Sequence, residues 1–208
     1  KQARDRKTQA ILPLRGKILN VANATIDKKQ ANQELQDLKI ALGCGTGKDC
    51  DPSKLRYQRI IIMTDADVDG AHIASLLMTY FYKEMRPIIA QGHLYLARPP
   101  LYRLMQGNTI IYAHDDADKD RLLKTTFRSN AQVEVSRFKG LGEMPWKQLR
   151  DTTMDPRTRK LIQVQLPQND PQEATDLENF VEDLMGKRPE RRFAFIQNHA
   201  KFAAHLDL

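Results

Sequence analysis

Apolar positions in the first half of the chain predict a strand, a helix and a second strand. Gln58–Thr64 contains the uninterrupted apolar run Ile60–Met63, which is typical of a parallel strand buried on both faces. After an acidic turn, apolar residues recur at helical spacing over Ile73–Met85, and Pro87 is expected to end that helix. Leu94–Ala97 alternates and predicts the next strand. This order is a βαβ unit, in which ligands bind at the carboxyl ends of the strands.

The second half of the chain predicts a smaller region of mixed helices and strands. Leu101–Met105 and Thr109–Tyr112 flank a Gly-Asn turn and predict a hairpin. Further strands are expected at Val133–Val135 and Leu161–Leu166, with a short helix that opens at Pro145. We therefore expect an α/β core over about residues 1–105 and a smaller α+β tail over residues 106–208.

Two helices are predicted to end the chain. Asp170-Pro171 has the form of an N-cap and first helical residue, and one apolar face follows it. The last helix is expected to turn Phe193, Ile196 and Ala200 inward. The first of the two is acidic, and the basic run Lys187–Arg192 comes directly after it.

The charge of the 208-residue chain is concentrated at its N-terminal end. The chain has 33 Lys plus Arg against 26 Asp plus Glu, for a net charge of +7. Residues 1–60 hold 13 basic and 6 acidic residues, and the remaining residues hold 20 of each. A polyanion such as nucleic acid is a natural partner for such a segment, although a solvated basic face explains the charge equally well. No apolar run approaches the roughly 20 residues that a bilayer requires, so no membrane partner is expected.

Three aspartates alternate in the acidic turn after the first predicted strand. If the turn is extended, Asp65, Asp67 and Asp69 point the same way, and three carboxylates this close need a cation. Carboxylate oxygens with water and phosphate indicate Mg²⁺ rather than Ca²⁺. The alternative is a simple helix cap, which we consider weaker for three alternating residues. An EF-hand is excluded because its twelfth position would be Leu76 instead of Glu.

A different enzyme class has the same Asp-x-Asp sequence pattern in this position. Phosphatases of the haloacid-dehalogenase type also place Asp-x-Asp after an apolar strand, with the first Asp as nucleophile. A second acidic pair, Asp115-Asp116, follows the apolar run Thr109–Tyr112 and keeps that interpretation open. Against it, a net basic segment of about 60 residues precedes a motif that normally opens such a domain.

Four ordered motifs resemble one protein family over nearly the whole chain. They are Ile11–Asn20, Asp65–Ile73, Gly92–Tyr102 and Arg137–Met144. The chain resembles the C-terminal half of the B subunits of bacterial type IIA topoisomerases. Within that family it is more similar to the topoisomerase IV branch than to the gyrase branch, because the long tail insertion of proteobacterial gyrases is absent; a gyrase from a lineage without the insertion stays open.

The resemblance implies a Toprim core, which is a Rossmann-like parallel sheet, followed by a tail that docks the A subunit in an A2B2 heterotetramer. It implies an ATP-hydrolysing DNA topoisomerase that is cytoplasmic and chromosome-associated, with ATP bound by an N-terminal domain outside this sequence. Mg²⁺ would be bound by Asp65, Asp67 and Asp69 together with a glutamate expected upstream of Lys1. The nucleophilic tyrosine would belong to the A subunit, so this chain alone is expected to be inactive.

The resemblance also implies a set of DNA contacts. Lys17, Asn20 and His72 match DNA-contacting positions of the family, and Arg191 matches one less securely because the alignment needs a gap there. Arg15 and Lys139 are plausible phosphate neighbours. Each has a structural alternative: Lys17 is one of many basic residues, His72 could cap a helical turn, and Arg191 could pair with the acidic helix before it. A basic DNA-binding module without enzymatic activity is the third hypothesis.

Overall fold

The computed structural model describes residues 1–127, 132–167 and 170–200, which form two compact units that alternate along the chain. The first unit comprises Lys1–Pro13, Arg59–Ala74 and Leu94–Val164. The second comprises Leu14–Gln58, Ser75–His93 and the chain from Gln165 onward. Because the units interleave, they do not test a single boundary, and the one expected after residue 105 stays a prediction. Within the described residues, no helix is long and apolar enough to cross a membrane.

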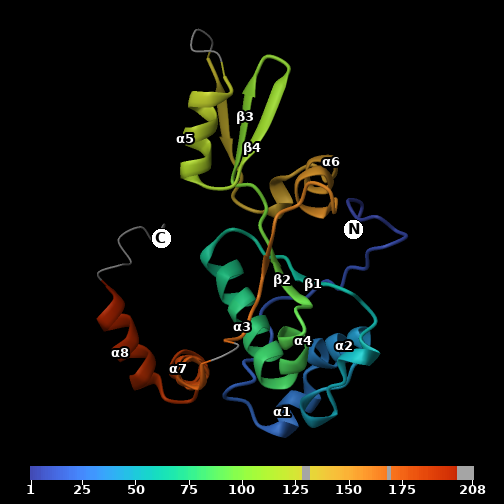
Figure 1. Ribbon diagram of the computed structural model, residues 1–208, viewed down its shortest axis with the longest axis vertical. Helices are drawn as coiled ribbons and strands as arrows, with labels where there is room; N and C mark the ends of the chain where they lie inside the picture. Colours follow the sequence, from blue (N-terminus) through green and yellow to red (C-terminus); the bar gives the residue numbers. More distant parts are fainter. Residues whose placement is uncertain (128–131, 168–169, 201–208) are drawn as a thin grey trace. The chain divides into compact units, whose positions relative to one another are not determined.

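The first unit contains the parallel strand pair that the sequence predicts (Figure 1). Strand β1 (Ile60–Ile62) pairs in parallel with β2 (Leu94–Ala97), with Ile60 opposite Leu94. Helix α3 (Val68–Glu84) connects them, so the predicted βαβ unit and the α/β class are confirmed. Strand β6 (Leu161–Gln163) lies antiparallel on the other side of β2, which gives the order β1-β2-β6.

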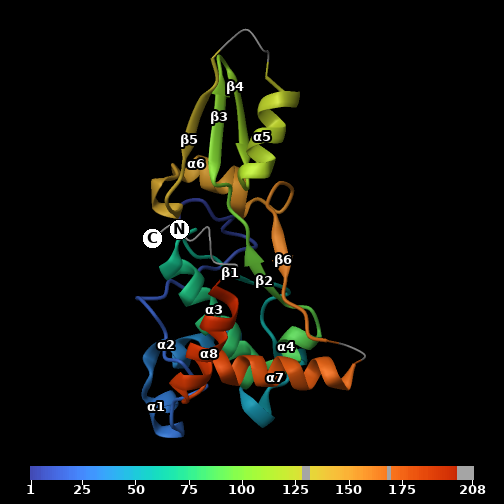
Figure 2. The same ribbon diagram turned by 90° about the vertical axis from the view of Figure 1, so that its left-hand side faces the viewer.

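A second, antiparallel sheet of the same unit has the order β4-β3-β5 (Figure 2). The predicted hairpin is formed by β3 (Tyr102–Gln106) and β4 (Thr109–Ala113), and Gly107 in its turn has a φ of 58°. Strand β5 (Glu134–Arg137) pairs with β3. Helix α5 (Asp116–Thr125) was not predicted, because its sequence is mostly polar; Leu122 and Leu123 pack it on the core of this sheet.

Three short helical turns lie between β5 and β6. They are η3 (Leu141–Glu143), α6 (Trp146–Leu149) and the π-helical turn η4 (Arg150–Met154). Pro145 is the N-cap of α6, so the helix predicted to open there is confirmed.

The second unit is helical and includes most of α3. Helices α1 (Ile26–Ala31) and α2 (Gln33–Leu42) are followed by the turns η1 (Gly47–Asp49) and η2 (Pro52–Lys54). Most of the apolar stripe predicted over Ile73–Met85 is buried: Leu76, Leu77, Tyr80 and Phe81 of α3, and Met85 directly after it, are all less than 6% exposed. Ile73 is half-buried. Helix α3 stops at Glu84, three residues before Pro87, as the sequence predicts. Pro87 itself lies in the first turn of α4 (Arg86–Ala90), where a missing backbone N–H is tolerated.

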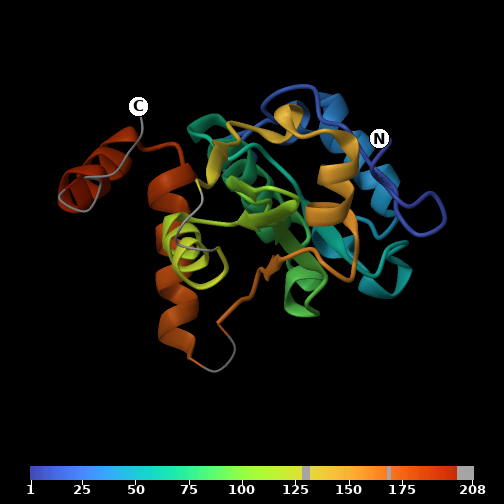
Figure 3. The same cartoon turned by 90° about the horizontal axis from the view of Figure 1, so that it is seen from above.

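Helices α7 (Pro171–Met185) and α8 (Pro189–His199) follow one another at the end of the described chain (Figure 3). The Asp170 side chain accepts a hydrogen bond from the Gln172 N–H at 2.8 Å, as the predicted N-cap requires. The expectation for α8 was wrong: Phe193, Ile196 and Ala200 are exposed. The helix packs through Phe195, whose ring centroid lies 5.5 Å from that of Phe180, and this contact turns the predicted face outward.

Candidate functional site

The acidic turn lies at the carboxyl end of β1. Strands β1 and β2 are parallel, so their carboxyl ends, at Ile62 and Ala97, meet at the same edge of the sheet. Asp65, Asp67 and Asp69 follow β1 and are all exposed. The turn is therefore found where an α/β sheet normally binds its ligand.

Asp65 is held between two parts of the first unit. The Leu141 N–H donates a hydrogen bond to Asp65 Oδ1 at 2.7 Å. A Cβ added at Gly140 would lie 3.0 Å from Asp65 Cγ, and one added at Gly70 would lie 2.1 Å from the Asp65 backbone oxygen. Both glycines thus leave room that a side chain would fill, and the Asp65 carboxylate is fixed by a loop far away in the sequence.

Asp67 and Asp69 belong to the start of α3. Asp67 Oδ1 accepts the Gly70 N–H at 2.6 Å, and its carbonyl accepts the Ala71 N–H at 2.9 Å, so it caps the helix. Asp69 is already helical, because α3 begins at Val68. The expectation that all three carboxylates alternate along an extended segment is therefore wrong for Asp69: successive helical residues turn by about 100°, and the two-residue period of a strand does not apply.

The oxygens of this turn fit a magnesium ion, which keeps part of its water shell, better than a metal enclosed by three or more protein side chains. Among the described residues, no group of three or more His, Cys, Asp or Glu side chains is arranged to hold a metal. Mg²⁺, however, is usually bound through one or two carboxylates, with water and phosphate completing its shell. The hydrogen bonds from Gly70 and Leu141 use one oxygen each of Asp67 and Asp65, and a carboxylate can bind a metal through its second oxygen.

The predicted DNA contacts fall into two sets. His72 and Lys139 belong to the first unit with the acidic turn, and both are exposed. The Lys139 N–H donates to Glu143 Oε2 at 2.8 Å, which closes the loop that carries Gly140 and Leu141. Arg15, Lys17, Asn20 and Arg191 belong to the second unit.

In the second unit, Asn20 and Arg191 have structural partners. The Asn20 side-chain amide donates to the Met185 carbonyl at 2.8 Å, and its oxygen accepts the Ala22 N–H at 3.1 Å. Arg191 Nη1 pairs with Asp183 Oδ1 at 2.9 Å, which is the alternative that the sequence left open for it. Arg15 and Lys17 are exposed. A role of these four residues toward DNA stays a prediction.

The second acidic pair has a structural role. Asp115 caps α5 by accepting the Asp118 N–H at 2.7 Å, and it pairs with Arg98. Asp116 accepts hydrogen bonds from Lys119 and from the Tyr102 hydroxyl, and these bonds lower the pKa of its carboxyl. The pair therefore does not supply the additional acids that a phosphatase interpretation needs.

Gly70, Gly140 and Leu141 are the site residues that sequence reasoning did not identify. From the motif Arg137–Met144 only Lys139 was taken as a candidate, because it carries a charge. The available signal was the pair of glycines in this motif, since glycine often marks a close approach of two backbone segments. The backbone N–H of Leu141, on which the contact depends, carries no such signal.

Two family models match the chain in succession. The Toprim domain matches residues 1–99, and the carboxyl terminus of the DNA gyrase B subunit matches residues 130–197. The Toprim match contains the acidic turn, and the second match contains the loop that holds Asp65.

Relatives over the full chain agree with these matches. The topoisomerase 4 B subunit of Caulobacter vibrioides is 59% identical over 209 residues, and that of Bartonella bacilliformis is 55% identical over 208 residues. The DNA gyrase B subunit of Halalkalibacterium halodurans is 50% identical over 208 residues. Each alignment covers 100% of this chain but only 29%, 30% and 32% of the respective relative. The chain thus spans about a third of the length of these proteins.

Proposed function

Since the chain belongs to the B-subunit family of bacterial type IIA topoisomerases, as its Toprim-and-tail segment, we propose that it binds Mg²⁺ and DNA for double-strand cleavage, strand passage and religation. The observation that carries this proposal is the Asp65 carboxylate, held by Leu141 at the carboxyl edge of the parallel strands. The higher identity to topoisomerase 4 relatives favours that enzyme, and gyrase is the second candidate.

The whole enzyme requires parts that other chains or segments provide. The proposed partner is a topoisomerase IV A subunit in an A2B2 assembly, which carries the tyrosine that attacks DNA. ATP would be hydrolysed by another domain of the full-length protein, and the upstream glutamate would complete the metal site. Exposed apolar side chains on α7 and α8, at Phe180, Phe193 and Ile196, are consistent with a surface that a partner protein covers. A bacterial cytoplasmic, chromosome-associated location follows from this role.

Asp65 and Asp67, with Asp69 as a further candidate, would hold the ion. When bound, Mg²⁺ supplies charge stabilisation at phosphate oxygens. The chain contributes orientation: the Leu141 N–H fixes the Asp65 carboxylate, and the Gly70 N–H fixes that of Asp67. His72 and Lys139, exposed in the same unit, are proposed to bind DNA phosphates beside it. Arg15, Lys17, Asn20 and Arg191 are proposed to extend this binding through the second unit.

Reconstitution tests the proposal. The 208-residue chain alone is expected to cut no DNA, whereas the full-length B subunit that contains it should cleave duplex DNA with Mg²⁺ once its A subunit is added. Gel analysis of covalent protein–DNA complexes measures the outcome. The same preparations should not hydrolyse a generic phosphomonoester, which a phosphatase would do. Tight DNA binding with no cleavage in the complete A2B2 enzyme would instead indicate a binding module.

The loop that holds Asp65 gives a smaller, local prediction. Gly140→Ala brings a methyl group to 3.0 Å from the Asp65 carboxylate, so this side chain must shift by a few tenths of an ångström. We expect cleavage by the full enzyme to fall by about 10- to 100-fold, because small displacements of positioning groups have costs of this order. Gly142→Ala is the matched control, since nothing lies within 4 Å of its added Cβ. Equal cleavage rates for the two variants would show that the Gly140 contact does not position Asp65.

A further inference from the structure

A second pocket in the first unit is lined by basic side chains from three separate segments. It has a volume of about 300 Å³ and shares no lining residue with the acidic turn. Arg98 follows β2, Arg121 lies on α5, and Lys160 precedes β6. His114, Asp115 and Asp118 complete the polar lining. Three cations against two carboxylates leave the pocket with one net positive charge when His114 is neutral.

The two carboxylates leave most of the donors in this pocket available. Arg98 Nη2 pairs with Asp115 Oδ2 at 2.5 Å, and Arg121 pairs with Asp118. Each guanidinium has five N–H donors, so one such bond leaves several for another acceptor. Lys160 is exposed, and no carboxylate of the described residues lies within ion-pair distance of its Nζ. An anion could therefore enter without breaking either ion pair.

His114 carries an unsatisfied nitrogen in the same lining. Its Nδ1 atom is buried and has no hydrogen-bond partner among the described residues. Burial, and next the nearby Lys160 charge, lower the pKa of the ring, so the neutral imidazole is favoured. In the neutral ring one nitrogen is an acceptor, and a buried acceptor without a donor is costly. Because this nitrogen has almost no solvent-accessible surface, a ligand that enters the pocket does not reach it, and the oxygens of an anion would be bound by the three cations.

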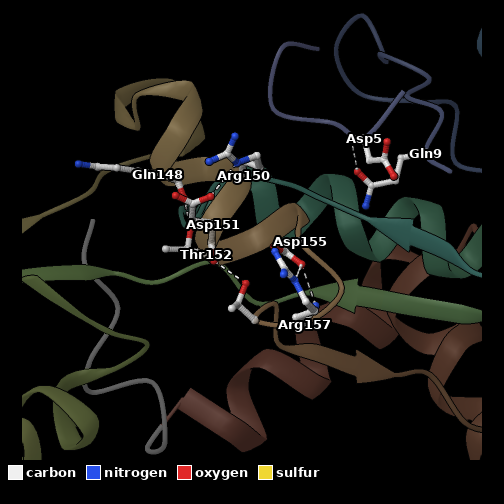
Figure 4. A network of polar contacts seen from close by, with 9 residues as sticks. Asp5, Gln9, Gln148, Arg150, Asp151, Thr152, Asp155 and Arg157 are labelled. Atoms are coloured by element: carbon white, nitrogen blue, oxygen red, sulfur yellow. Dashed lines mark hydrogen bonds and ion pairs between the residues drawn. The ribbon is translucent and has the colours of Figure 1, made fainter. Parts of the chain in front are cut away.

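The segment that presents Lys160 is fixed by a compact turn (Figure 4). The Asp155 carbonyl accepts the N–H groups of Thr158 and Arg159. The Asp155 carboxylate accepts hydrogen bonds from the Arg157 guanidinium, and these bonds lower the pKa of Asp155 to about 2. Directly after this turn, the Lys160 carbonyl accepts the Arg98 N–H at 3.0 Å. Two of the three cations are thus joined through the backbone, and the pocket needs no rearrangement to present them.

We propose that this pocket binds the phosphate group of a small phosphate monoester. Arg98, Arg121 and Lys160 would donate to its oxygens. A phosphate monoester carries about two negative charges near pH 7 and a phosphodiester of the DNA backbone carries one, so three cations make a monoester or inorganic phosphate the better match. The pocket volume admits a phosphate together with a small organic group.

Inorganic phosphate titrated into the 208-residue chain, in EDTA and followed by amide NMR shifts, tests this site without any cleavage reaction. We expect Lys160→Gln and Arg121→Gln each to weaken phosphate binding by about tenfold, the effect of one lost charge-assisted hydrogen bond. Lys124→Gln, which removes an exposed lysine on α5 outside the pocket, should leave it unchanged. Circular dichroism of each variant checks that it is folded. If one of the two pocket variants is unfolded, the phosphate titration of the other still tests the site.

A 20-base-pair duplex in a second titration distinguishes the source of the phosphate. If only inorganic phosphate binding responds to Lys160→Gln, the pocket takes a phosphate that is not part of DNA, as the proposal of a small monoester requires. If instead duplex affinity falls, its salt slope drops by about 0.9 and inorganic phosphate competes with the duplex, the pocket takes a DNA phosphate and the monoester assignment is overturned. If the pocket variants behave like Lys124→Gln toward both ligands, no phosphate site exists there.

Discussion

Asp65→Asn and Asp67→Asn are each expected to abolish Mg²⁺-dependent DNA cleavage by the full-length protein that contains this chain, assayed with its A subunit. Asparagine keeps an oxygen that can accept the Leu141 or Gly70 N–H, so the turn and the α3 cap should persist. What is lost is the negative charge that a magnesium ligand requires. Because a bound metal contributes several kcal/mol to charge stabilisation, we expect a loss of at least about a thousandfold in the cleavage rate.

Asp170→Asn is the matched control for this pair, because Asp170 caps α7 in the same way that Asp67 caps α3. It should leave cleavage at the parental level. Size-exclusion chromatography should show that all three variants assemble with the A subunit, and DNA binding in EDTA should be unchanged. Parental cleavage by Asp65→Asn or Asp67→Asn would contradict the metal assignment and leave helix capping as the role of these residues.

The sequence predicted the part of the fold that depends on buried apolar runs. The unbroken run in β1 and the helical stripe of α3 predicted a strand and a helix at these places, and the structure confirms both elements. The expected burial of the strand on both faces was wrong, because β1 is an edge strand in which only Ile62 is buried and Ile60 and Ile61 are half-buried. The same reasoning placed the acidic turn at the carboxyl edge of the strands. Here local sequence was sufficient because the strand, the turn and the helix follow one another directly.

The errors arose where a neighbour in space decides the outcome. Asp69 was assigned to an extended segment because helix α3 was expected to begin only after the acidic turn, whereas the Asp67 cap starts it at Val68. The face of α8 was taken from its own apolar residues, but the contact of Phe195 with Phe180 selects another face. Neither the start of a helix nor its packing face follows reliably from apolar spacing alone.

The support of Asp65 could not be read from the sequence at all. It depends on the Leu141 N–H, which every residue except proline possesses, and on the absence of side chains at Gly70 and Gly140. Such a contact becomes visible only when the fold brings the loop between β5 and α6 to the turn after β1. The side-chain chemistry of the site was thus predictable, whereas the backbone that orients it was not.

Gly70→Ala is expected to destabilise the chain strongly. The added Cβ would lie 2.1 Å from the Asp65 carbonyl oxygen, and because both partners are backbone, no side-chain rotation can relieve the overlap. Forcing such contacts apart typically costs about 1–3 kcal/mol, and a 2.1 Å approach to a backbone oxygen puts this case at about 3 kcal/mol, from which the gain of about 1 kcal/mol for alanine over glycine inside a helix is subtracted. We expect the free energy of unfolding, from urea titrations followed by circular dichroism, to fall by roughly 2 kcal/mol.

The comparison with Gly142→Ala determines what that loss means. Gly142 has open space around its added Cβ, so its substitution should change the free energy of unfolding by less than about 0.5 kcal/mol. If Gly70→Ala were as stable as this control, the start of α3 would not approach Asp65 so closely, and the orientation of its carboxylate would need another explanation. If it is destabilised with an unchanged m-value, the turn and the helix are packed as described, because the same surface is then exposed on unfolding.

The shifted carbonyl in Gly70→Ala belongs to Asp65 itself, so cleavage by the full enzyme should fall together with stability in this variant. Gly140→Ala, by contrast, should reduce cleavage with little change in stability.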